Sequence, residues 1–202
     1  MSKEKVVMLI PSVSWYSKFP WKMVSHAALI LTAILKNKYD FHILDANGAD
    51  YSQKECIEKL RKLEPELVMV SGVSAEYSKY PHLGVKLAKA ACPNCITVIG
   101  GIYPTVMEGE VLKDKNVDYI FMGHAEERID DFLSTVLKHD IKKLSGLQGV
   151  GYRDESGKII VNRVTTFLSD VKEHIKLDYS LVDIKPYLDQ DNNNYQLAPG
   201  VP

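Results

Sequence analysis

The chain has 202 residues, which is enough for one α/β domain with a hydrophobic core and a smaller extension. Its 25 basic and 26 acidic residues leave a formal net charge of −1, so the composition favours neither nucleic acid nor an anionic membrane surface as a partner. No apolar run approaches the ~18 residues that cross a bilayer, and no signal peptide precedes the first strand. With an odd number of cysteines, these features predict a cytoplasmic protein.

Five short apolar segments are typical of buried parallel strands, and they alternate with segments of helical periodicity. Strands are expected at residues 6–10, 41–44, 67–71, 97–99 and 119–122. Helices are expected at 21–36, 52–63, 81–91, 106–113 and 126–138. This alternation predicts a flavodoxin-like (Rossmann-like) doubly wound α/β fold, with a five-stranded parallel sheet in the order 2-1-3-4-5.

The pattern changes after residue 140, so residues 1–140 are expected to form the α/β domain. Residues 147–153 and 158–163 flank a polar turn that ends at Gly157, and they predict a β-hairpin within an extension at 141–166. Residues 167–202 lack strong periodicity and end without a helix or a strand. We interpret them as a linker toward a downstream domain.

The loops after the strands exclude several common ligands. The first strand is not followed by a G-x-G-x-x-G motif, and the chain contains no G-x-x-x-x-G-K-[ST] motif. The loop at residues 11–20 has no carboxylate for the magnesium of a phosphoacceptor domain. The fourth predicted strand ends at Gly100-Gly101. Because these two residues lack a Cβ, a flat, bulky group can closely approach the edge of the sheet that is formed by the carboxyl ends of its strands, which we call the carboxyl edge.

Cys92 and Cys95 form a C-x-x-C pair, which invites a redox or zinc interpretation. Redox pairs of this kind usually lie at a helix N-terminus, whereas this pair follows a predicted helix. The third cysteine, Cys56, and the scattered histidines offer no second pair of zinc ligands. A structural role is therefore expected, and no metal ligand is assigned.

Four segments of the chain form a recognisable series of motifs. They are Ser71-Gly72-Val73-Ser74, Gly100 to Thr105, Val117-Asp118 with Gly123-His124-Ala125-Glu126, and Gly149-Val150-Gly151-Tyr152-Arg153. In their order and spacing, these motifs resemble the N-terminal cobalamin-binding domain of cobalamin-dependent radical S-adenosylmethionine (SAM) proteins. The resemblance covers essentially the whole chain.

The resemblance implies that cobalamin binds at the carboxyl edge, with its nucleotide tail along Gly100 and Gly101. Ser71 and Ser74 would donate hydrogen bonds to the tail, and loop amides would bind the amide arms of the corrin. No catalytic residue is assigned. The expected cofactor-binding residues are Ser12, Val13, Ser14, Asp45, Ala46, Asn47, Ser71, Gly72, Val73, Ser74, Gly100, Gly101, Ile102, Tyr103, Pro104, Gly123 and Glu126.

Two departures from the family pattern refine this expectation. Cobalamin domains that supply a lower axial histidine carry D-x-H-x-x-G after the first strand, and residues 11–20 contain no histidine. The resemblance therefore implies a histidine-off mode, in which His26, inside the first predicted helix, is only a minor candidate ligand. His124 stands where the family usually has glutamate, and we expect a surface histidine there.

A radical SAM domain needs a C-x-x-x-C-x-x-C motif, which Cys56, Cys92 and Cys95 do not form. SAM and a 4Fe-4S cluster are therefore expected only in a downstream radical SAM domain of a methyltransferase or related enzyme. This chain alone is not expected to be catalytic. One alternative is a degenerate scaffold that docks onto a radical SAM barrel without binding cobalamin. A weaker one is an enzyme acting on a small phosphorylated ligand, for which no acid, base and nucleophile set is present.

Some residues also have structural interpretations. Asp45 is either a cap for the bend at Asn47-Gly48 or a ligand contact, and Gly100-Gly101 is alternatively a tight turn without a ligand. An aromatic cluster in the first loop is expected to form the corrin floor, to contact a missing domain or to pack on the sheet. Its members are Trp15, Tyr16, Phe19 and Trp21.

Overall fold

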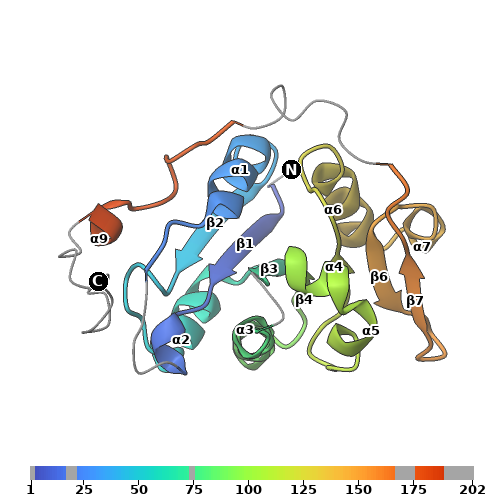
Figure 1. Ribbon diagram of the computed structural model, residues 1–202, viewed down its shortest axis with the longest axis horizontal. Helices are drawn as coiled ribbons and strands as arrows, with labels where there is room; N and C mark the ends of the chain where they lie inside the picture. The colour runs from blue at the N-terminus through green and yellow to red at the C-terminus, as the bar shows by residue number, and fades with distance from the viewer. Residues whose placement is uncertain (1–2, 17–21, 73–75, 167–175, 189–202) are drawn as a thin grey trace, which may run out of the picture.

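The computed structural model describes residues 3–16, 22–72, 76–166 and 176–188. A seven-stranded sheet forms the centre, with α1 and α6 on one face and α2, α3 and α5 on the other (Figure 1). The strands are β1 (Lys5–Ile10), β2 (Asp40–Asp45), β3 (Leu67–Ser71), β4 (Ile96–Gly100), β5 (Tyr119–Phe121), β6 (Val150–Arg153) and β7 (Ile159–Asn162). The helices are η1 (Val13–Trp15), α1 (His26–Leu35), α2 (Gln53–Leu63), α3 (Lys79–Ala91), α4 (Ile102–Val106), α5 (Glu108–Val111), α6 (Ile129–Leu137), α7 (Ile141–Leu144) and α9 (Lys185–Leu188).

The strand order is β2-β1-β3-β4-β5-β6-β7, and the first five strands are parallel. The expected α/β fold and the order 2-1-3-4-5 are therefore confirmed, but the expected strand number of five is wrong. The hairpin does not stand apart from the sheet, because β6 pairs antiparallel with β5, with Phe121 opposite Val150. Gly151 makes this close packing possible, since a Cβ there would lie 2.7 Å from the Ile120 side chain.

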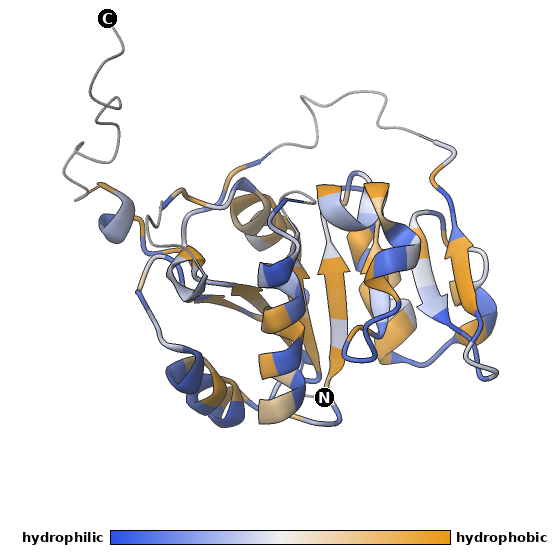
Figure 2. Cartoon of the chain, turned by 60° about the horizontal axis from the view of Figure 1, so that its bottom comes forward, coloured by the Kyte–Doolittle hydropathy of each residue, from blue (hydrophilic) through white to orange (hydrophobic). Residues whose placement is uncertain are grey.

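Apolar side chains cover both faces of the sheet, which explains why the inner strands β1, β3 and β4 are almost continuously hydrophobic. Figure 2 colours the chain by hydropathy, with hydrophobic residues in orange. Alternate residues of each strand point to opposite faces. In β1, Met8 joins the core under α1 and α6, whereas Val7 joins the core under α2 and α3. The sheet is thus held from both sides, and its carboxyl edge is left to the loops.

The helices differ from the sequence prediction mainly at their ends. The first helix starts at His26 and not at residue 21, because Ser25 caps it by accepting a hydrogen bond from the Ala28 amide. In place of the expected helix at 106–113, α4 ends at Val106 and α5 covers only Glu108–Val111, and Met107 between them has a non-helical backbone (φ −133°, ψ 37°). The short helix α7 was not predicted.

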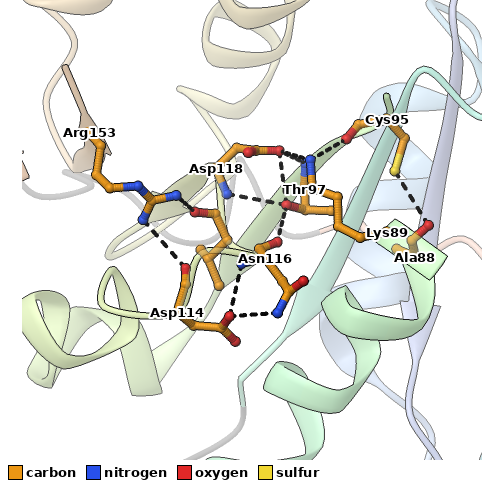
Figure 3. A network of polar contacts seen from close by, with 9 residues as sticks. Ala88, Lys89, Cys95, Thr97, Asp114, Asn116, Asp118 and Arg153 are labelled. Carbon is orange, nitrogen blue, oxygen red and sulfur yellow. Dashed lines mark hydrogen bonds and ion pairs between the residues drawn. The ribbon is translucent and has the colours of Figure 1, made fainter. Parts of the chain in front are cut away.

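A polar network holds the amino ends of β4 and β5 at the edge opposite the carboxyl loops (Figure 3). The Asp118 carboxylate accepts hydrogen bonds from the Thr97 amide (2.8 Å) and from Lys89 Nζ (2.6 Å). Arg153 donates to the carbonyls of Leu112 (2.6 Å) and Val117. Asp118 and Arg153, two residues of the recognised motifs, therefore stabilise the fold and lie away from the candidate site.

Residues 176–188 pack back against α1 and the end of β2. The Asp178 amide donates to the Leu29 carbonyl (3.2 Å), and its carboxylate pairs with Lys36 Nζ at 2.6 Å. Val182 is buried in the core beside α1. We call residues 176–188 the strap. They belong to the stretch interpreted as a linker, and the proposed division of the chain into domains remains a prediction.

Within the described residues, no helix is both long and apolar enough to cross a membrane.

Candidate functional site

Two cavities meet at the carboxyl edge of the sheet. The first, which we call the slot, has a volume of about 240 Å³ and lies between the sheet, α1 and the start of α6. The second, which we call the cleft, has a volume of about 390 Å³ and lies over the ends of β1 and β3, beside the first turns of α1 and α3. Ala27, Ser71 and Gly101 line both cavities, so the slot opens directly into the cleft.

The slot is mainly apolar. Its floor is formed by sheet residues on the α1 and α6 side, and its walls come from those two helices. The apolar lining includes Met8, Met69, Val98 and Phe121 from the strands, Ala27, Ile30 and Leu31 from α1, and Ala125 and Ile129 near the start of α6. Few polar side chains interrupt this surface, namely Ser71, His124 and Glu126. Such a lining suits a flat, hydrophobic group with a small number of hydrogen-bonding positions.

Gly100 and Gly101 play different parts at the mouth of the slot. Gly101 has a φ of +102°, and a Cβ there would lie 2.8 Å from the Gly72 carbonyl oxygen, so the backbone turn itself requires glycine. The Gly72 amide in turn donates to the Gly100 carbonyl (2.7 Å). At Gly100 the nearest atom to a Cβ would be 3.7 Å away, which is an ordinary contact. The missing side chain at Gly100 therefore leaves space in the slot, whereas Gly101 serves the turn.

The loop after β1 is held by its own polar side chains. Ser12 is fully buried and caps η1 by accepting a hydrogen bond from the Ser14 amide. The two hydroxyls also lie 2.7 Å apart. Asn47 Oδ1 accepts from the Val13 amide at 3.0 Å, which ties this loop to the loop after β2. Val13 and Asn47 line the cleft, while Ser12 and Ser14 line neither cavity.

Asp45 is engaged within the chain through both carboxylate oxygens. Oδ1 accepts from the Gly48 amide at 2.8 Å and caps the bend, and Oδ2 accepts from the Tyr187 hydroxyl at 2.5 Å. Asp45 and the neighbouring Ala46 line neither cavity. Of the two interpretations of Asp45, the structure therefore favours the structural cap.

Tyr103 belongs to a hydrogen-bonded chain that holds α4 against α3 and α5. Its hydroxyl lies 3.0 Å from His82 Nε2, and His82 Nδ1 lies 2.7 Å from Asp114 Oδ2. Burial raises the pKa of Tyr103, so its hydroxyl stays protonated. Tyr103 and Pro104 are buried and line neither cavity, whereas the preceding Ile102 is exposed and lines the cleft.

Arg128 holds the loop between β5 and α6 in place. Its guanidinium donates to the carbonyls of Met122 (2.8 Å), His124 (2.6 Å) and Gln148 (2.6 Å). The same guanidinium lies over the Phe121 ring, 4.9 Å from its centroid. This clamp positions the segment from Gly123 to Glu126 at the slot.

Glu126 faces the slot from the first turn before α6. Its side chain is only 10% exposed, and Oε2 has no hydrogen-bond partner among the described residues. His124 lies at the mouth with a side chain that is 59% exposed, as expected for a surface histidine, and its Nδ1 is 3.9 Å from Glu126 Oε2. The slot is thus lined by a residue whose carboxylate has one buried oxygen without a hydrogen-bond donor from the described residues.

The structure brings about half of the expected binding residues to the two cavities, and Val73 and Ser74 lie outside the described residues. The expected residues that line a cavity are Val13, Asn47, Ser71, Gly72, Gly100, Gly101, Ile102, Gly123 and Glu126. Sequence reasoning missed the apolar lining, although alternation within the strands would have placed Met8, Met69 and Val98 on one face. It also missed Tyr77 and Tyr80, which line the cleft.

The aromatic cluster of the first loop only partly faces the site. Trp15 donates its indole N–H to the Tyr51 carbonyl (2.9 Å) and packs against the core under α2 and α3. Tyr16 is exposed and its ring contacts Tyr80 edge to face, with centroids 5.3 Å apart. Phe19 and Trp21 lie outside the described residues.

The cysteines are free thiols, and Cys92 and Cys95 lie at the C-terminal end of α3. Burial raises the pKa of Cys95 to about 11 and raises that of Cys92 as well, which keeps both thiols protonated and poorly nucleophilic. Among the described residues, no three histidine, cysteine or carboxylate side chains are grouped closely enough to hold a metal ion.

A mostly parallel open sheet, with a slot and a cleft at the carboxyl ends of its parallel strands, is the architecture of an α/β ligand-binding domain. The chain matches the B12 binding domain family over residues 18–133, more than half of its length, and it belongs to that family. The expected membership of a cobalamin-binding family is confirmed by this match.

The chain is also similar to part of several longer proteins. It is 28% identical over 172 residues to the anaerobic magnesium-protoporphyrin IX monomethyl ester cyclase of Cereibacter sphaeroides, covering 80% of this chain and 26% of the relative. It is 23% identical over 190 residues to the cytidylyl-2-hydroxyethylphosphonate methyltransferase of Streptomyces wedmorensis, covering 84% of this chain and 35% of the relative. The chain therefore spans about a quarter to a third of the length of these curated relatives.

Two solved structures share the fold. One is OxsB, a cobalamin-dependent SAM radical enzyme with aqua-cobalamin and SAM bound, with a TM-score of 0.64 and 18% identity over 81% of this chain and 22% of that chain. The other is TsrM from Kitasatospora setae, a radical SAM methyltransferase with cobalamin and a 4Fe-4S cluster bound. Its TM-score is 0.64, with 18% identity over 85% of this chain and 30% of that chain.

Proposed function

We propose that this chain binds cobalamin at the carboxyl edge of its sheet, as the cobalamin-binding module of a radical SAM methyltransferase or related enzyme. The observation that carries the proposal is the slot that opens into the cleft, in a chain of the B12 binding domain family. The slot would take the nucleotide tail, and the cleft would take one face of the corrin. When bound, cobalamin supplies a cobalt centre that can carry a methyl group for transfer.

The residues of the edge fit such a group. Gly100 leaves room beside the floor of the slot, and the Ser71 hydroxyl lies where the slot meets the cleft, so it can hydrogen-bond a polar part of the tail. Around the cleft, Ile10, Pro11 and Val13 offer an apolar surface for the corrin. The role of this chain would be to bind, orient and shield the cofactor.

We further propose a histidine-off binding mode. The β1 loop presents Pro11 and Val13 to the cleft, and neither side chain can ligate cobalt. His26 also lines the cleft and is the alternative ligand to exclude. The electron paramagnetic resonance spectrum of the bound Co(II) form should be the same for the wild type and for His26→Ala. A nitrogen splitting that disappears only in His26→Ala would contradict this mode.

The chain alone would not be catalytic, and chemistry would depend on a radical SAM domain of the same protein, with its own SAM and 4Fe-4S cluster. The longer relatives support this proposal, because two of them are named as a cyclase and a methyltransferase and match this chain over a minor part of their length. The strap also supports it, since Tyr187 brings residues 185–188 beside the end of β2, near the cleft. The three free thiols are compatible with the reducing cytoplasm that we propose as its location.

A direct test is titration of the 202-residue chain with hydroxocobalamin. Binding should shift the corrin absorption bands in a saturable way, and the pigment should co-elute with the chain in gel filtration. Unchanged bands and separate elution would favour the second hypothesis, a degenerate scaffold that only docks onto a radical SAM barrel. The open slot supports binding over that scaffold.

A further inference from the structure

The lining of the slot includes one carboxylate that a ligand without a hydrogen-bond donor would leave unpaired. Glu126 is nine-tenths buried, it lines the slot, and its Oε2 is the single buried side-chain nitrogen or oxygen without a hydrogen-bond partner among the described residues. A buried acceptor without a donor costs free energy, so an isolated carboxylate in such a place is an unusual feature.

In the described part of the chain, no cationic side chain donates a hydrogen bond to this oxygen. The Arg128 guanidinium is held by the carbonyls of Met122, His124 and Gln148. His124 Nδ1 is 3.9 Å away, beyond hydrogen-bond distance, and its ring is largely exposed. Oε2 itself is shielded from solvent, but Glu126 lines the slot, so a rotation of its carboxylate would present this oxygen to a donor that enters there.

We propose that Glu126 makes the slot selective for corrinoids whose lower base carries a hydrogen-bond donor. This inference rests on the proposed function, in which the slot takes the nucleotide tail. An ionised carboxylate only accepts hydrogen bonds. The 5,6-dimethylbenzimidazole of cobalamin, when it is not bound to cobalt, offers a lone pair and two methyl groups. A 5-hydroxybenzimidazole base offers a hydroxyl, and an adenine base offers an exocyclic amine.

The selectivity follows from the cost of leaving Oε2 unpaired. A base with a donor would satisfy the carboxylate, whereas dimethylbenzimidazole would bury it without a partner. Sites built to hydrogen-bond a polar group discriminate strongly against analogues that lack it. We expect the hydroxyl-bearing corrinoid to bind about tenfold or more tightly than cobalamin, as one hydrogen bond to a charged group allows.

The test measures dissociation constants by calorimetry for four corrinoids: cobalamin, its 5-hydroxybenzimidazole and adenine analogues, and cobinamide, which lacks the tail. The proteins are the wild type, Glu126→Gln and the control Glu127→Gln. Glu127 is the next residue along the chain and does not line the slot. The amide of Glu126→Gln can both donate and accept, so it should reduce the preference for the hydroxyl-bearing base to less than about threefold. Glu127→Gln should keep the wild-type preference.

The comparison of the hydroxylated and dimethylated benzimidazoles is the decisive one, because both bases coordinate cobalt through the same ring. Equal wild-type affinity for these two corrinoids would overturn the inference while leaving cobalamin binding intact. So would a preference for cobalamin, or an equal weakening of all three tailed corrinoids in Glu126→Gln, which would indicate a contact to the ribose that they share. If no corrinoid binds, including cobinamide, the proposed function itself fails. Thermal unfolding of each variant separates these outcomes from misfolding.

Discussion

The Tyr187 hydroxyl donates a 2.5 Å hydrogen bond to Asp45 Oδ2, and these two residues lie 142 positions apart in the chain. Burial and this hydrogen bond raise the pKa of Tyr187, so the phenol remains a donor at any ordinary pH. The contact fastens the end of the strap to the loop after β2. It thereby holds residues 185–188 beside the end of β2.

Replacing Tyr187 with phenylalanine should loosen the strap. The change removes the donor to a half-buried carboxylate, which typically stabilises by about 1 kcal/mol or slightly more. Amide hydrogen exchange across residues 176–188 should become faster, while exchange in β1 and β3 stays slow. The control is Tyr179→Phe, because Tyr179 is exposed. Unchanged exchange in Tyr187→Phe would show that the packing of Val182 alone holds the strap.

Attachment of the strap should also weaken in acid through Asp178. Its hydrogen bonds with Lys36 and Ser180 lower its pKa from 3.8 to about 2 in the folded state. A lowered folded pKa means that the stabilisation is complete above the unfolded value near 3.8 and is lost as the pH falls toward 2. Hydrogen exchange of the strap, corrected for its intrinsic pH dependence, should therefore rise between pH 4 and pH 2 in the wild type. Asp178→Asn should show faster exchange without this rise, and a rise of equal size would contradict the assignment.

The two glycines at the end of β4 should respond differently to alanine. Gly101→Ala places a Cβ 2.8 Å from the Gly72 carbonyl and at a φ of +102°, so it should destabilise the chain by about 2 kcal/mol or more. That corresponds to a drop in Tm of roughly 4–8 °C for a chain of this length. Gly100→Ala should remain within about 1 kcal/mol of the wild type. Equal effects in thermal unfolding would contradict the separate roles given to the two residues.

Arg128→Leu should release the loop that carries Glu126. The change leaves up to three carbonyl groups without their donor, which we expect to cost about 2–4 kcal/mol. The matched control is Arg163→Leu, because Arg163 is 82% exposed and its 3.5 Å ion pair with Glu108 should contribute less than about 0.5 kcal/mol. Denaturant unfolding measures both. A smaller loss in Arg128→Leu than in the control would show that the clamp is dispensable.

Much of the sheet was predictable because its strands are buried on both faces and are therefore continuous apolar runs. Residues 67–71 were predicted with the same bounds as the observed β3. The hairpin was predicted as well, but its place in the sheet was not, since antiparallel pairing of Phe121 with Val150 is a tertiary contact without a local sequence signal. The short helix α4 contains Pro104 and starts directly after Gly101, so it shows no helical period.

About half of the candidate site was predictable, and the physical reason is clearest where the backbone geometry demands a particular residue. Gly101 and Gly72 stand out in the sequence as site residues because the turn that they form leaves no room for a Cβ. The motif that joins Val117-Asp118 to Gly123–Glu126 was interpreted as one unit, yet Asp118 stabilises the amino end of β4 and Glu126 lies at the carboxyl edge. Arg128 and Tyr187 act through partners that are distant in sequence or are backbone carbonyls, and neither leaves a pattern in the sequence.

The most direct test of the account compares cobalamin with cobinamide on a chain whose slot is filled. Gly100→Leu puts a large side chain into the slot, and Gly109→Leu makes the same change where a Cβ would meet nothing within 4 Å. We predict that Gly100→Leu weakens cobalamin binding by about tenfold or more, leaves cobinamide within about threefold, and that Gly109→Leu changes neither. If the folded Gly100→Leu variant binds cobalamin as tightly as the wild type, the tail does not occupy the slot and the central claim is wrong.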